Sequence, residues 1–173
     1  LLSWHPEIRK RVRAEAREVI GDDEPGFEHA ADLSYTGKVF TEALRLYPPA
    51  WGVFRSASGA QSLGGYTIDD GSLVIMPQWS VHRDGRYFEN PDQFDPSRWD
   101  DRGPSERPAY FAFASGPHAC IGRGFAENGA RVALATLVRD FDLDVPRDQL
   151  ADLMVTPTLR PGNGVDATVS RAE

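Results

Sequence analysis

The chain has 173 residues, 40% of them hydrophobic and 26% charged, and its net charge is −7. This length and composition predict one domain over residues 1–173. The negative charge argues against non-specific nucleic-acid binding, which depends on Lys and Arg meeting phosphates. We also expect no membrane segment and a cytoplasmic location. No apolar run is long enough to span a bilayer, no signal peptide is recognisable, and a lone cysteine suits a reducing interior.

The N-terminal third predicts helices. Apolar residues recur at helical spacing at Ile8, Val12, Ala16 and Val19. Pro6 stands in the first turn of this helix and Gly21 just past its end, where each is favoured. A short helical turn is expected over residues 27–33, and a second long helix over residues 39–47 ends at Pro48-Pro49.

Residues 51–77 change to a strand pattern. Tyr66-Thr67-Ile68 and Leu73-Val74-Ile75 flank Asp69-Asp70-Gly71, which predicts a β-hairpin closed by that turn. Residues 83–110 show neither periodicity and predict a long coiled excursion, which is usually functional or held by specific contacts.

A third helix is predicted to begin after Ile121, followed by short strands over residues 141–145, 153–159 and 165–169. One face of this helix carries Phe125, Ala126, Gly129, Ala130, Ala133 and Leu137. Trp51, Trp79 and Trp99 are expected to be core residues.

Cys120 lies just before the third helix. A free cysteine is most often a small buried hydrophobe, but Gly116, Pro117 and Gly122 permit unusual backbone around this one, and His118 stands two positions before it. Backbone N–H groups and the positive end of a helix dipole would stabilise a thiolate here. We therefore interpret Cys120 as a metal ligand.

Zinc suits this cysteine poorly. A structural zinc site needs about four nitrogen or sulfur ligands, whereas the four histidines of the chain are widely spaced. One thiolate indicates a metal that brings its other ligands, and the porphyrin of haem does so, leaving an axial position for the protein.

The stretch from Phe113 to Gly122 has the spacing Phe-x-x-Gly-x-His-x-Cys-x-Gly. This resembles the haem-binding signature of the cytochrome P450 family. Glu42-Ala43-Leu44-Arg45 resembles the Glu-x-x-Arg of the same family, and Phe94-Asp95-Pro96-Ser97-Arg98-Trp99 resembles a later segment that contributes a second arginine. The resemblance implies a mainly α fold with small β-sheets (α+β), and a buried ion-paired triad of Glu42, Arg45 and Arg98.

The same resemblance implies haem b (iron protoporphyrin IX) as cofactor. Cys120 would be its axial ligand, and Phe113 would pack near the sulfur. Gly116 and Gly122 would let the loop approach. His118 and Arg55 match positions that bind the haem propionates; the alternative for Arg55 is a solvated surface residue, and we favour the propionate role. Residues 49–54 and 155–158 match regions that line the substrate side.

One family feature is absent from the sequence: no Ala/Gly-Gly-x-Asp/Glu-Thr segment of the distal helix occurs. The chain therefore resembles the C-terminal part of a longer enzyme, a single partial domain. We expect weak or no haem binding from the chain alone. Self-association is also expected, because apolar surface meant for the other part would be exposed.

The implied function is that of a haem-thiolate monooxygenase, which activates O2 with electrons from a ferredoxin or flavoprotein reductase and oxidises a lipophilic small molecule. Two alternatives stay open: an enzyme that uses peroxide or rearranges an oxidised substrate, and a haem-binding module without turnover. His82-Arg83-Asp84 imitates a kinase catalytic loop, but Glu89 occupies the position at which that loop needs an asparagine, so we reject a kinase.

Overall fold

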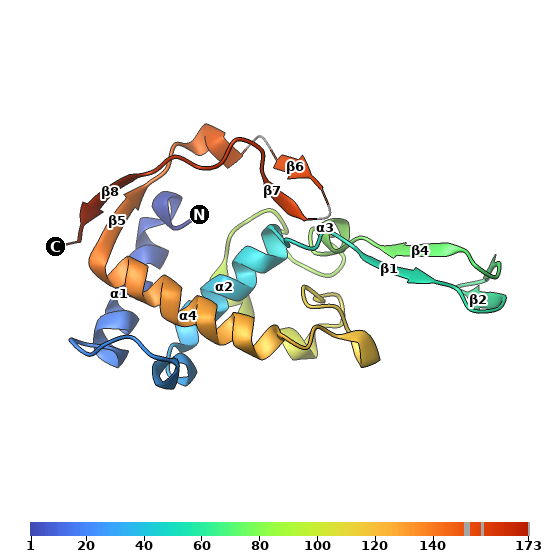
Figure 1. Cartoon of the computed structure of the whole chain (residues 1–173), viewed down its shortest axis with the longest axis horizontal. Helices are drawn as coiled ribbons and strands as arrows, with labels where there is room; N and C mark the ends of the chain where they lie inside the picture. The colour runs from blue at the N-terminus through green and yellow to red at the C-terminus, as the bar shows by residue number, and fades with distance from the viewer. Residues whose placement is uncertain (151–152, 157, 173) are drawn as a thin grey trace.

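The computed structural model describes residues 1–150, 153–156 and 158–172. Three long helices form its centre: α1 (Pro6–Val19), α2 (Ser34–Leu46) and α4 (Arg123–Asp140) (Figure 1). Two clusters of buried side chains join them. One contains Val12, Val39, Leu46, Phe94 and Val138; the other contains Ala16, Ile20, Leu33 and Ala135.

The predicted helices of the N-terminal third are confirmed. Pro6 is the first residue of α1, where its missing N–H costs nothing. Gly21 follows the helix with a φ of +57°, a left-handed conformation that favours glycine. Two short 3-10 helices flank α1, namely η1 (Leu2–Trp4) and η2 (Phe27–Ala31).

A narrow arm of strands projects from the helices (Figure 1). It consists of β1 (Val53–Ser56), β2 (Gln61–Leu63), β3 (Tyr66–Ile68) and β4 (Leu73–Met76). The predicted hairpin between residues 66–68 and 73–75 is wrong, because β3 pairs with β2 and β4 pairs with β1, both antiparallel. Gly64 and Gly65, with φ of +59° and +85°, form the tight turn between β2 and β3, because such a two-residue turn needs a positive φ at both positions.

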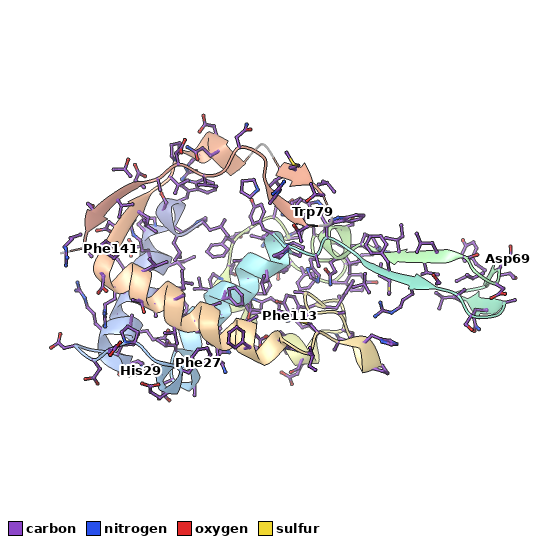
Figure 2. The ribbon with its side chains drawn as sticks, in the orientation of Figure 1. Phe27, His29, Asp69, Trp79, Phe113 and Phe141 are labelled. Atoms are coloured by element: carbon purple, nitrogen blue, oxygen red, sulfur yellow. The ribbon has the colours of Figure 1, made fainter. Side chains whose placement is uncertain are left out.

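The segment after the arm is mostly irregular, as predicted. It begins with the one-turn helix α3 (Gln78–Val81) and contains 3-10 helices η3 (Pro96–Trp99) and η4 (Pro104–Glu106). A further 3-10 turn, η5 (Gly116–His118), lies just before α4. Figure 2 shows Trp79 at the base of the arm and Asp69 at its tip.

The C-terminal part contains β5 (Phe141–Asp144), η6 (Arg147–Leu150), β6 (Leu153–Val155), β7 (Leu159–Pro161) and β8 (Thr168–Arg171). The strand expected over 141–145 is confirmed as β5, and it pairs with β8. The segment 153–159 is two strands, not one, because β6 turns back and pairs with β7. Residue 157 of that segment lies outside the described residues. The mainly α fold with small β-sheets is confirmed.

The predicted apolar face of α4 is largely open. Phe125 is 76% exposed and Leu137 is 47% exposed, whereas the residues of α4 that are buried, Ala135 and Val138, lie on the side that packs on the other helices. Ala133 and Leu137 line a cavity of about 490 Å³ between α4, α2 and β5. Among the described residues, no helix is both long and apolar enough to cross a membrane.

Candidate functional site: the cysteine loop and the buried Glu42 network

The loop that carries Cys120 is closed by backbone hydrogen bonds. The Cys120 N–H donates to Phe113 O at 2.9 Å, which ties the cysteine to the other end of the loop. Gly116 has a φ of +72°, so glycine suits the bend at which η5 begins. The Arg123 N–H then donates to Cys120 O at 3.3 Å as α4 starts, and Gly122 is the N-cap of that helix.

The cysteine side chain is free and exposed. Within this chain, Cys120 is therefore not a buried packing residue. A Cβ added at Gly122 would stand 3.9 Å from the Cys120 sulfur, an ordinary van der Waals distance, so Gly122 lies directly beside the thiol. Phe113 is half-buried at the start of the loop, with the Arg123 guanidinium 5.8 Å from its ring centroid. Figure 2 places Phe113 and Phe141 at opposite ends of α4.

The two residues expected at the propionates differ in their surroundings. His118 is exposed in η5. Arg55 is half-buried in β1 and donates to Phe54 O at 2.8 Å. It lines a cavity of about 480 Å³ together with Phe111 and Ser115 from the segment that leads into the cysteine loop. Arg55 is therefore brought to the side of the loop by the base of the arm.

Glu42 and Arg45 of α2 are completely buried and form a two-pronged ion pair. Arg45 Nε and Nη2 lie 2.9 Å from Glu42 Oε2 and Oε1. Arg98 Nε lies 3.3 Å from Glu42 Oε1, and its side chain is 8% exposed. The structure thus brings all three residues of the expected triad together.

Backbone groups complete this network. The remaining Arg45 hydrogen bonds go to the carbonyls of His82, Pro91 and Gln93, at 2.7, 2.6 and 3.0 Å. Arg45 therefore fastens the irregular segment after α3 onto α2. This agrees with the expectation that a coil of such length needs specific contacts.

Trp99 has a role that sequence reasoning missed. It is buried as expected, but its indole N–H also donates to Glu42 Oε2 at 3.0 Å. Trp79 and Trp51 are only partly buried; Trp79 stacks on the Arg83 guanidinium, and the Trp51 indole donates to Thr156 O. A partner for the Trp99 indole could have been inferred from the general rule that a buried Trp N–H is bonded.

The sequence profile described as Cytochrome P450 matches residues 1–164. The chain belongs to the cytochrome P450 family. The P450 fold accounts for the structure too: the retinoic acid-bound cyanobacterial CYP120A1 superimposes with a TM-score of 0.90 at 29% identity, over 99% of this chain and 40% of that one.

Bacterial P450 relatives are similar in sequence. Cyclooctat-9-en-7-ol 5-monooxygenase of Streptomyces melanosporofaciens is 40% identical over 79% of this chain and 30% of its own length. Pentalenene oxygenase of Streptomyces avermitilis is 36% identical over 86% of this chain and 33% of its own length. The chain thus spans about a third of the length of the curated relatives it matches.

The residues present fit a haem with an axial thiolate. The family implies haem, and the thiol is exposed on its loop. Arg55 lines a cavity beside the same loop, where a cation can bind a carboxylate. Apolar Ile121, 105% exposed, directly follows the cysteine and offers surface for an apolar macrocycle.

Proposed function

We propose that the chain supplies the thiolate side of a haem-thiolate monooxygenase that oxidises a lipophilic small molecule. The exposed Cys120 thiol, on a loop closed by its own backbone N–H, is the observation that carries this proposal. In cytochromes P450 a cysteine thiolate pushes electron density towards haem iron and favours O–O cleavage. Cys120 would hold the iron, and Arg55 and His118 would pair with the propionates.

Two features support the reaction class and the partners. The names of two relatives specify one small organic compound oxidised by each, which supports a small-molecule substrate. Monooxygenases of this family take electrons from a redox partner, so we propose a ferredoxin or a flavoprotein reductase as donor. Because the chain spans about a third of these relatives, turnover is proposed for the protein that contains it.

The carbon monoxide complex of the reduced haem-loaded protein tests the proposal. Thiolate ligation gives a strongly red-shifted Soret band, which we expect in the wild type and expect to be lost in Cys120→Ala. Ser62→Ala is the control, since Ser62 is exposed in β2 of the arm and the variant keeps the thiol, so the band should remain. A wild-type band typical of histidine ligation would overturn the assignment of Cys120. Oxygen consumption that needs an added reductase would support the monooxygenase over a peroxide-using enzyme.

A further inference from the structure

Two polar side chains, at the first residue of α3 and at its C-cap, are completely buried and lie one helical turn apart. Gln78 and His82 are both 0% exposed. His82 Nε2 accepts the Phe111 N–H at 3.1 Å, and Gln78 Nε2 donates to Phe111 O in a short hydrogen bond. Both backbone polar groups of Phe111 are therefore held by side chains of one helical turn.

Packing alone does not explain polar residues at these positions. Gln78 Oε1 and His82 Nδ1 are buried and have no hydrogen-bond partner among the described residues. Because Nε2 accepts a backbone N–H, the neutral ring carries its proton on Nδ1, so a donor as well as an acceptor is left unpaired. Apolar side chains of similar volume would avoid that cost. The two bonds to Phe111 are what the polar side chains provide.

Phe111 begins the turn that leads into the cysteine loop. The Ala114 N–H donates to Phe111 O at 2.8 Å, and Ala114 has a φ of +59°, a left-handed conformation that is unfavourable for alanine. Phe113, inside this turn, accepts the Cys120 N–H. A strained turn stays formed only when its surroundings hold it, and Gln78 and His82 hold its first residue.

Gln78 and His82 together form a clamp on Phe111, and the His82 side of this clamp is itself held in the core. His82 O accepts a hydrogen bond from Arg45, and the His82 ring stacks on Tyr110 with centroids 5.1 Å apart. Burial raises the pKa of the Tyr110 phenol above its usual range, so this neighbour is neutral. Phe111 is thereby connected, through His82 and Arg45, to the buried Glu42–Arg45 pair.

We propose that Gln78 and His82 are positioning residues for the cysteine loop, acting through the backbone of Phe111 and the turn 111–114 to set the place of Cys120. This inference rests on the proposed function for its purpose, since the loop is taken to present a thiolate to haem. The clamp itself is a property of the chain without haem. It can therefore be tested separately.

The first experiment measures residue-level amide hydrogen exchange in the chain without haem. His82→Phe keeps the ring and removes the acceptor. It should speed exchange at Ala114 and Cys120 by about tenfold, the effect of losing one buried hydrogen bond. Amides in the middle of α1 should change by much less. His82→Gln places an acceptor close to the position of Nε2 and should restore protection.

The matched control is His29→Phe. His29 Nδ1 also accepts a backbone N–H at 3.1 Å, from Gly26, but within η2. This variant should leave exchange at Cys120 unchanged. Equal effects of both variants, equal acceleration throughout the chain by His82→Phe, or an unprotected Cys120 amide in the wild type would each overturn the clamp.

The second experiment uses the haem-loaded protein. His82→Phe should lower the fraction of thiolate-type band in the carbon monoxide complex, and His82→Gln should restore it. An unchanged fraction would overturn a role in placing the thiolate. Absence of the band from the wild type would overturn the proposed function instead, while the exchange results would still decide whether the clamp exists.

Discussion

Glu42 and Cys120 each lie at the centre of a group of residues with family resemblance, yet their side chains have opposite surroundings. Glu42 is fully buried and accepts hydrogen bonds from Arg45, Asp95, Arg98 and Trp99. Cys120 is exposed, and backbone bonds hold its loop while its thiol faces outward. The first region is satisfied by contacts within the chain. The second leaves its central side chain exposed.

The largest expected loss of stability is at Glu42. Glu42→Gln removes the charge that compensates buried Arg45, and we expect the free energy of unfolding to fall by about 3–5 kcal/mol. Urea denaturation measures this. The matched control is Glu7→Gln, because Glu7 and Lys10 form the same i,i+3 pair with side chains 81% and 71% exposed. That change should cost about 0.5 kcal/mol or less. Similar losses in the two variants would show that burial of the Glu42 pair has no special weight.

His82 contacts both the Glu42 network, through Arg45, and the segment that leads to Cys120, through Phe111. We expect its burial to make the free energy of unfolding depend on pH. Burial lowers the pKa of His82 from 6.5 to about 4. The unfolded chain therefore binds this proton at higher pH than the folded one, and stability is complete above about pH 6.5 and falls as the pH drops towards 4. The loss from this group is at most about 3 kcal/mol. The free energy of unfolding of wild type minus that of His82→Gln, measured from pH 7 to pH 4, should follow this slope. A difference that does not change with pH would contradict it.

The open apolar face of α4 is exposed like Cys120, and we expect it to contact a second copy of the chain. Its apolar residues should drive self-association as concentration rises, which light scattering would detect. Leu137→Glu places a charge on this face and should weaken association. Leu63→Glu is the control, because Leu63 is 64% exposed but lies on the arm. A wild type that stays monomeric throughout the series would contradict the prediction, and a larger effect of Leu63→Glu would move the contact to the arm.

Sequence reasoning succeeded where a local pattern carries the information and failed where distant contacts decide. The helices follow from apolar spacing, Pro6 and Gly21. The pairing of β1 with β4 was missed because Val53–Ser56 and Leu73–Met76 meet across an inner hairpin, so the turn nearest each strand does not reveal its partner. Gln78 was missed for a similar reason: its partner is a backbone carbonyl 33 residues away, at Phe111, and no side-chain pattern encodes such a bond.

The smallest expected change is at the cysteine itself. Cys120→Ala should alter the free energy of unfolding of the chain by about 0.5 kcal/mol or less, because substitutions at exposed positions rarely do more. The backbone bonds from Cys120 to Phe113 and Arg123 do not need the thiol and should persist. Urea denaturation beside Glu42→Gln gives the comparison directly. A loss of several kcal/mol in Cys120→Ala would mean that the sulfur is packed against the chain. The thiol would then belong with Glu42 as a structural group and would not be available to a metal.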